Sequence, residues 1–597
     1  METMKRTDTC GSLRKTDSGK SVILNGWVHR KRNHGGIFFI NLRDRYGVTQ
    51  VTVDTEANVE LAAVCDELRN EYVVAAQGIV RERPGDMVNS SMETGEIEVA
   101  ASKIVILNRC DVLPFQIDEE SKASEDLRLK YRYLDLRSAA MQKRIKMRGA
   151  AAFAVREWMT ANGFYEIETP TFIKSTPEGA RDYLVPSRLY PGKFYALPQS
   201  PQLYKQILMV AGFDKYFQIA RCYRDEDSRG DRQPEFTQID IEMSFVARDD
   251  VLSMTEGLMR HVFKKVLNIE LPEKFRRLTW EEAMELYGSD KPDLRFDMQL
   301  KDFSPFAASC GFQAFKDALS GGGAVKALVV KGRADYSRKQ IEELEAHAKI
   351  YKAKGMAWMK VASGGALEGG VSKFFADDAQ KIKSAFGASE GDLIVIIADA
   401  NRNIVNTALG AVRSKLGRDL GFCDPARFEF VWIVDFPMFE YNEDEKKWEA
   451  AHHLFTWPQE KYHATMESDP GSVKGDLYDL VLNGYELASG SIRIHDPEMQ
   501  KRVFKIAGID VAEAEKKFGF LTEAFKYGAP PHGGIAPGFD RLVMIMAGLS
   551  SIKDVIAFPK NSFAISPMDD CPSEVDQKQL DELRITIVNE KAAQEIV

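Results

Sequence analysis

Cysteine is scarce in this 597-residue sequence, and it is never arranged in pairs. The seven thiols stand at positions 10, 65, 110, 222, 310, 423 and 571, and no two of them form a CxxC spacing. Such scattering argues against a disulfide framework and against a structural zinc site, and it is typical of a reducing compartment. We therefore expect a cytoplasmic protein without structural zinc.

Long apolar runs and an excess of positive charge are also missing. No run approaches the ~18 residues of a membrane span, and the first twenty residues lack the apolar segment of a secretory signal. A net charge of −9 disfavours a generally basic nucleic-acid binder but leaves room for a local basic patch. At roughly 150 residues per domain, the length predicts about four domains.

The most informative stretch is Phe217 to Phe245, which reads as two strands joined by a charged loop. In its second half Gln238, Asp240 and Glu242 alternate with apolar residues, the pattern of a half-buried strand. An ordinary solvated face would explain such a pattern. However, the loop also holds Arg229 and Arg232 among acids, a mixture that suits a phosphate with counter-ions.

Residues 22–107 alternate short strands with turns, and a helical stretch follows the third strand. Five strands in this order predict an OB-fold. On the second and third strands Phe39 could stack on a base and Gln50 could read one, while Arg30 and Arg32 supply positive charge for single-stranded RNA. One of Phe38 and Phe39 must instead belong to the barrel core.

A second hairpin is predicted around Asn483-Gly484, a two-residue turn of the I′ type. Counting outward, Asp479 and Glu486 become diagonal neighbours on one face, which suits a Mg²⁺ ion completed by water and phosphate. Two solvated carboxylates remain the alternative. Strict alternation places Arg493 on the opposite face, so we expect a β-bulge at Gly490.

These stretches resemble a known family. They are similar to the three motifs of the class II aminoacyl-tRNA synthetases in the bacterial aspartyl form. Motif 1 is similar to GFYEIETPTF, motif 2 to RDEDSRGDRQPEFTQID and motif 3 to GGIAPGFDRLVMIMAG. The resemblance runs nearly end to end. It implies an α/β multidomain protein: an OB-fold β-barrel followed by an antiparallel-sheet catalytic domain with an inserted α+β domain. The expected segments are 1–110 (anticodon binding), 111–138 (hinge), 139–294 and 423–560 (catalytic), 295–422 (insertion) and 561–597 (C-terminal extension).

The resemblance also implies the reaction and its residues. Aspartate and ATP would form aspartyl-adenylate, and tRNA would then accept the aspartyl group, with Mg²⁺ as the cofactor. The substrate carboxylate is itself the nucleophile, so catalysis falls to charge-neutralising groups such as Arg224 and Arg541. For aspartate the expected residues are Glu178, Ser200, Gln202, Lys205, Arg224, Asp240, His452 and Arg493. For ATP they are Arg224, Asp225, Glu226, Gln233, Glu486, Gly538, Phe539, Asp540 and Arg541, and for the metal Asp479 and Glu486.

His453 could equally be a core or supporting histidine. HHLF and ELASGS depart from the family's usual HHPF and ELGGGS, which alters backbone freedom beside the site but removes no reacting group.

Further implications concern tRNA and assembly. The expected anticodon residues are Arg30, Arg32, His34, Phe39, Gln50 and Gly85. The pair His34 and Gly85 resembles enzymes that charge both tRNA-Asp and tRNA-Asn, after which a separate amidotransferase converts the Asp-tRNA-Asn. Pro170 stands at the place of the family's dimer-interface proline, which implies a homodimer.

Several rivals remain. A discriminating enzyme would charge tRNA-Asp alone, and the related asparaginyl and lysyl enzymes share the OB domain and the motifs. The long insert and the pair Lys205 and Arg493 favour aspartate. A non-catalytic OB-fold RNA binder or an amidating paralogue would be expected to lack Arg224, Glu226 or Arg541, and all three are present.

Overall fold

The structure is a computed structural model that describes residues 4–117, 122–176, 180–227 and 230–588. It divides into two compact units, Met1–Lys143 with Pro567–Asp569, and Arg144–Ser566 with Asp570–Val597. Within the described part of the chain, no helix is both long and apolar enough to span a membrane.

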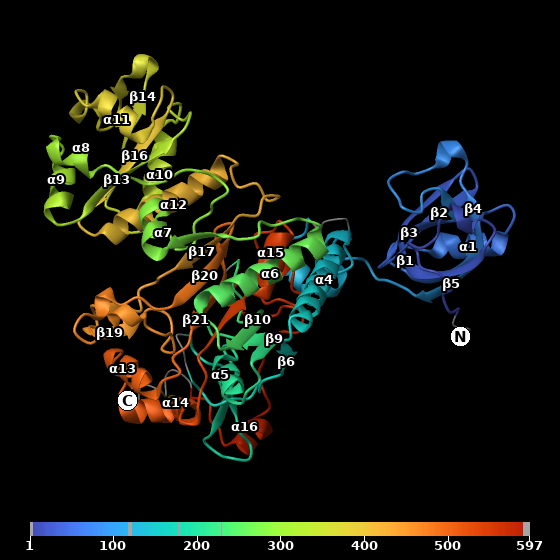
Figure 1. Cartoon of the computed structure of the whole chain (residues 1–597). Helices are drawn as coiled ribbons and strands as arrows, with labels where there is room; N and C mark the ends of the chain where they lie inside the picture. Colours follow the sequence, from blue (N-terminus) through green and yellow to red (C-terminus); the bar gives the residue numbers. More distant parts are fainter. Residues whose placement is uncertain (1–3, 118–121, 177–179, 228–229, 589–597) are drawn as a thin grey trace. The chain divides into compact units, whose positions relative to one another are not determined.

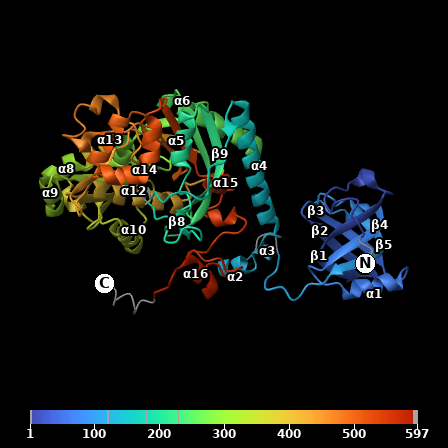
Figure 2. The ribbon, with the colours of Figure 1, turned by 90° about the horizontal axis from the view of Figure 1, so that it is seen from below.

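The first unit contains a closed five-stranded barrel with strand order β1-β2-β3-β5-β4 (Figure 2). Its strands alternate between buried and outward residues, as in β2, where Phe38, Ile40 and Leu42 face the core. The predicted five strands with a helix after the third are confirmed. The elements are β1 (Ser21–His34), β2 (Ile37–Asp44), β3 (Gly47–Asp54), α1 (Val59–Glu67), β4 (Val73–Glu82) and β5 (Ile97–Asn108).

A short helical segment follows the barrel and contacts it through arginine. Buried Glu71 accepts hydrogen bonds from Arg43 at 2.8 and 2.9 Å and from Arg137 at 3.0 Å, and the Arg137 guanidinium lies over the Trp27 ring. The segment contains α2 (Glu125–Lys130) and α3 (Arg132–Asp135), before the long helix α4 (Ala139–Ala161).

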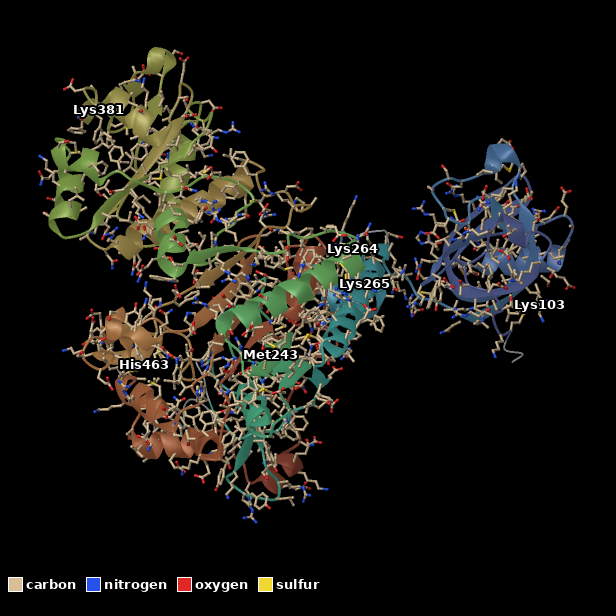
Figure 3. The ribbon with its side chains drawn as sticks, viewed as in Figure 1. Lys103, Met243, Lys264, Lys265, Lys381 and His463 are labelled. Carbon is tan, nitrogen blue, oxygen red and sulfur yellow. The ribbon has the colours of Figure 1, made fainter. Side chains whose placement is uncertain are left out.

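The second unit is built on an eight-stranded sheet of order β11-β17-β20-β21-β22-β10-β9-β6 (Figure 1). One face packs against apolar residues of three helices, and Met243 (Figure 3) belongs to this core. The opposite face carries the polar residues of β10. The strands are β6 (Tyr165–Glu166), β9 (Lys215–Tyr223), β10 (Glu235–Ser244), β11 (Arg276–Thr279), β17 (Phe430–Val434), β20 (Leu477–Leu482), β21 (Tyr485–Ile492) and β22 (His532–Pro537). The covering helices are α4, α6 (Arg248–Leu267) and α15 (Phe539–Met546).

Between β11 and β17, which are neighbours in this sheet, the chain forms a second sheet of five antiparallel strands (Figure 1). This second sheet has an apolar core on each face, because consecutive residues of β13, such as Ala327 and Leu328, belong to different cores. Its strands are β12 (Lys301–Asp302), β13 (Ala324–Val330), β14 (Ala357–Val361), β15 (Leu367–Glu368) and β16 (Leu393–Asp399). Its helices are α8 (Ser304–Ser309), α9 (Gln313–Ser320), α10 (Arg338–Ile350), α11 (Ala379–Phe386) and α12 (Arg402–Asp419).

Smaller elements complete the second unit. The hairpin β7–β8 lies between motifs 1 and 2 of the sequence, and α5 leads into β9. The bounds are β7 (Leu184–Pro186), β8 (Phe194–Ala196), α5 (Gln202–Val210), α7 (Trp280–Tyr287), β18 (Phe439–Asn442), β19 (Lys447–Ala450), α13 (Pro497–Ile506), α14 (Val511–Phe525) and α16 (Gln577–Leu583).

Candidate active site

A cavity of about 600 Å³ opens over the polar face of the central sheet. Its walls come from α5, β10, β21, the start of α15 and the loops that join them. Among the sequence-predicted residues it brings together Ser200, Gln202, Lys205, Arg224, Glu226, Gln233, Asp240, His452, Glu486, Arg493, Gly538, Asp540 and Arg541.

At one end of the cavity, two cations and two anions form a buried cluster. Lys205 Nζ lies 2.7 Å from Asp240 Oδ1 and 3.3 Å from Glu242 Oε2. Arg493 donates from Nε and Nη2 to the two oxygens of Glu242, at 3.0 and 3.2 Å. The cluster is therefore balanced in charge before any ligand enters.

The two carboxylates of this cluster differ in their partners. Burial raises the pKa of Asp240, although Lys205 opposes the shift. Burial acts on Glu242 in the same direction, but the charges of Arg493 and Lys205 outweigh it and lower the pKa of Glu242. Asp240 Oδ2 and Gln202 Nε2 have no hydrogen-bond partner in the structure. An acceptor and a donor are thus available to a small zwitterionic ligand.

The two adjacent histidines have different surroundings. His453 lies 3.0 Å from Arg493 Nη1 and 3.2 Å from Ser491 Oγ, whereas His452 packs edge-on against Phe436. Burial, followed by the Arg493 charge, lowers the pKa of His453 well below its usual value. Burial also lowers the pKa of His452, which is close enough to feel the Glu486 charge. His453 thus lies beside the arginine, while His452, which was expected to bind aspartate, also lines the cavity.

The other end of the cavity holds the two arginines expected at the phosphates. The Arg224 guanidinium makes no ion pair with a described residue; it lies over the Phe236 ring at 5.1 Å, and its Nε has no partner. Arg541 donates to the Glu486 carbonyl and, at 3.0 Å, to Asp231 Oδ2. Arg224 is thus free to bind a ligand with its planar fork.

The hairpin of β20 and β21 confirms part of its prediction and corrects another part. Val481 pairs with Glu486, and Asn483 and Gly484 both have positive φ, as expected for a I′ turn. However, the register shifts because Leu480 pairs with Ala488, which leaves Leu487 as the extra residue. The bulge is therefore at Leu487, three residues before the predicted Gly490, because its place depends on pairing and packing across the sheet rather than on the nearest glycine.

The bulge brings Glu486, Ser489 and Arg493 to the face that carries Asp479. Burial and the nearby Glu486 charge raise the pKa of Asp479 well above its usual value, and Asp479 Oδ1 has no hydrogen-bond partner. An orphaned buried carboxylate oxygen beside a second carboxylate suits a hard cation such as Mg²⁺. Among the described residues, no cluster of three or more His, Cys, Asp or Glu side chains forms a complete metal site, so such a cation would need ligands from a substrate or water.

Other predicted residues lie at the edge of the cavity or outside it. Gln233 exchanges two hydrogen bonds with the Lys560 backbone, at 2.8 and 3.0 Å, and Glu226 pairs with Arg232 at 3.2 Å. Asp225 pairs with Arg181 at 3.4 Å and does not line the cavity.

Two predicted residues at the start of α15 have structural contacts. Phe539 is buried in the core beneath Arg148. Asp540 binds Arg148 and accepts a 2.7 Å hydrogen bond from the Thr237 backbone. Glu178 and Arg229 lie outside the described residues.

The predicted anticodon residues of β1, β2 and β3 lie on one outer face of the barrel. Directly paired residues share a face, and Arg32 pairs with Phe39, while His34 pairs with Ile37 beside them. Phe39 is partly exposed and Phe38 belongs to the core, so the choice between the two rings is settled. Gln50 lies on the same face and donates at 2.8 Å to Glu98. Gly85 is exposed, and a Cβ there would meet nothing within 4 Å.

Sequence reasoning missed several residues at the site. Glu242, the buried partner of Arg493 and Lys205, follows Asp240 by two residues, and the period-2 pattern placed it on the polar face without a role. Ser489 and Lys291 line the cavity itself. No local sequence signal marks them, because the bulge and a long-range contact bring them there.

Comparison with known proteins agrees with this arrangement. The family described as "tRNA synthetases class II (D, K and N)" matches residues 124–562, and "OB-fold nucleic acid binding domain" matches residues 22–107. The aspartate–tRNA(Asp/Asn) ligase of Treponema denticola is 69% identical over 98% of this chain and 100% of its own length. The aspartate–tRNA ligase of Macrococcus caseolyticus is 51% identical, covering 98% of both chains.

A solved structure extends the comparison to the fold. Asparaginyl-tRNA synthetase from Pyrococcus horikoshii, complexed with asparaginyl-adenylate, superimposes with a TM-score of 0.57 at 18% identity, covering 93% of this chain and 98% of that one. Because the family match spans most of the chain, and near-full-length relatives share half or more of its residues, the chain belongs to the class II tRNA synthetases of the aspartate, lysine and asparagine group.

Proposed function

We propose that the protein attaches L-aspartate to tRNA in two steps, through aspartyl-adenylate, and that it charges both tRNA-Asp and tRNA-Asn. The observation that carries the aspartate assignment is the buried cluster of Lys205, Arg493, Asp240 and Glu242. Its two cations can hold a side-chain carboxylate, and the unpartnered oxygen of Asp240 can accept from an ammonium group, so the cluster complements an amino acid that bears a second carboxylate. The name of the Treponema denticola relative supports the wider tRNA range.

In the first step, binding and orientation do the chemical work. Asp240 Oδ2 accepts a hydrogen bond from the substrate ammonium, and the positive charges of Arg493 and Lys205 hold the side-chain carboxylate. Arg224 bridges the reacting carboxylate and the α-phosphate, so that the substrate oxygen attacks phosphorus in line. Asp479 and Glu486 would hold Mg²⁺, which neutralises charge on the departing pyrophosphate when bound.

Asparagine is rejected because of the donors at the closed end of the cavity. Lys205 and Arg493 can only donate hydrogen bonds. The amide NH₂ of asparagine would face these donors, and it could not replace the charge of the carboxylate. An unsatisfied polar contact of this kind supports strong discrimination.

The tRNA range is tested by charging purified tRNA-Asp and tRNA-Asn transcripts and comparing kcat/KM. We expect values within tenfold of each other, because exposed His34 and Gly85 present no bulky group against either anticodon. A preference for tRNA-Asp beyond a hundredfold would leave the discriminating enzyme as the correct reading.

A variant sharpens this experiment. We expect His34→Leu to move the ratio toward tRNA-Asp while pyrophosphate exchange stays unchanged, because His34 belongs to the barrel unit and exchange needs the catalytic cavity alone. Lys103→Leu, on β5 of the same barrel, serves as the control and should leave the ratio unchanged.

We further propose that a second copy of the chain covers the aromatic surface around exposed Pro170. Phe172 is 59% exposed and contacts the Tyr195 ring at 5.4 Å, and Tyr165 is 63% exposed. Exposed apolar groups gathered in this way are typical of an interface.

Light scattering should give about twice the 67.2 kDa of one chain. Phe172→Asp should give one chain mass, and Tyr527→Asp, at an exposed aromatic elsewhere, should not. A single-chain mass for the wild type at micromolar concentration would contradict the proposal.

An amidotransferase acting on Asp-tRNA-Asn is the partner that this function requires, since that product carries the wrong amino acid for its anticodon.

A further inference from the structure

Lys291 lies in the cavity wall, although it comes from the segment that leads into the inserted sheet. Its Nζ is 3.9 Å from Glu486 Oε2, and both side chains are more than one-third exposed. Lys291 and Glu486 both line the cavity. A lysine therefore stands beside one of the two carboxylates proposed for the metal.

The present partner of Lys291 is a weak one. An exposed pair at 3.9 Å contributes little to stability, since such pairs are worth about 0–1 kcal/mol. The ammonium can leave Glu486 at little cost when a more highly charged anion enters. Lysine suits such an anion because it is a compact point charge on a flexible stem.

The backbone that carries Lys291 is held rigidly just after it. Asp293 forms a bidentate pair with Arg295, at 2.7–3.2 Å. Arg413 of α12, which is buried, donates to the carbonyls of Asp293, Phe296 and Met298 at 2.6–2.9 Å. The inserted domain thus fixes the start of this segment.

The β20–β21 turn approaches the segment from the other side. A Cβ at Gly484 would lie 3.2 Å from Asp293 Cβ, and Gly484 has a φ of +85°. Glycine is required there by both the backbone conformation and the close contact. The turn that positions Glu486 therefore also positions the segment of Lys291.

We propose that Lys291 is a phosphate-binding residue of the adenylation site, which contacts the β- or γ-phosphate of ATP and is held in place by Arg413 of the inserted domain. This inference rests on the proposed assignment of the cavity to ATP. It gives the inserted domain a part in forming the site, because α12 anchors a residue that reaches substrate.

The test compares Lys291→Met with wild type in equilibrium ATP binding by calorimetry without Mg²⁺, and in pyrophosphate exchange. We expect ATP affinity to fall at least tenfold and the KM for ATP to rise by a similar factor. The KM for aspartate and the melting temperature should stay unchanged, because the lost ion pair is exposed. Lys291→Arg should recover most of the affinity.

Lys349→Met is the matched control, since Lys349 has similar exposure and one carboxylate partner, Glu345, on α10. It should leave ATP binding unchanged. ATP affinity of Lys291→Met within twofold of wild type would overturn the inference, and so would an equal rise in the KM values for ATP and aspartate, which would indicate general distortion. If wild type itself showed neither ATP binding nor exchange, the proposed function would fail instead.

Discussion

Arg224 gives the sharpest test of the proposed chemistry, because replacing it should lower catalysis strongly while it changes the stability of the fold very little. In the structure its guanidinium has no ion pair with a described residue, and its contact with the Phe236 ring at 5.1 Å is one that lysine can also make. Arg224→Lys should therefore change the melting temperature by no more than a degree or two. The substitution keeps the charge but removes the planar two-donor fork.

The catalytic loss should be much larger. A donor that acts on the transition state is worth about 3 kcal/mol, and each 1.4 kcal/mol corresponds to about a factor of ten. Aspartate-dependent pyrophosphate exchange should therefore fall by two orders of magnitude or more. The measurement is exchange at saturating ATP and aspartate, with the melting temperature recorded on the same sample.

Arg221→Lys is the control for this experiment. Arg221 lies three residues earlier, at the surface of β9, pairs with Glu235 and does not line the cavity. It should keep exchange within about threefold of wild type. An Arg224→Lys enzyme that is equally active would remove Arg224 from the mechanism, and a large fall in melting temperature would show that the guanidinium has a structural role.

Two further predictions concern the buried cluster. Glu242→Gln should destabilise the catalytic unit by about 3–5 kcal/mol, because it leaves Arg493 buried without its carboxylate. The melting temperature, measured by calorimetry, checks this prediction, and Glu235→Gln, at a partly exposed position on the same strand, is the control. Equal falls in melting temperature for the two variants would contradict it. His453 should make wild type lose stability more steeply than His453→Gln as pH falls from 7 to 5. Its pKa is lowered on folding, so its contribution is complete above the unfolded value near 6.5 and is lost as pH falls toward the folded value, by up to about 1.4 kcal/mol per pH unit. Parallel pH profiles would refute the assignment.

The sequence predicts the elements well where local patterns decide them. The I′ turn at Asn483-Gly484 and the five barrel strands both follow from turn residues and periodicity. The place of the bulge does not, since Leu487 is displaced by pairing between strands. Glu242 shows the same limit. Period 2 places it on the polar face, but its partner Arg493 comes from 251 residues further along the chain.

Most of the active-site residues expected from the family resemblance line the cavity, including Arg224, Lys205 and Asp240. It did not separate the surroundings of His452 from those of His453, because adjacent side chains are distinguished by the packing of Phe436 and Ser491 around them. It also gave no role to Lys291, which reaches the cavity through contacts made by α12.

The bulge at Leu487 has a consequence for how the chain can change in length. Glu486 and Arg493 are seven residues apart, an odd number, so on a regular strand they would point in opposite directions. The extra residue at Leu487 brings Glu486, proposed for the ATP end of the cavity, and Arg493, proposed for aspartate, onto the same face of the sheet. Deleting any single residue from 487 to 492 would reverse that parity and separate the ATP end from the aspartate end, even if every side chain named in the mechanism were kept. In this segment, the number of residues is as strict a requirement as their chemical identity.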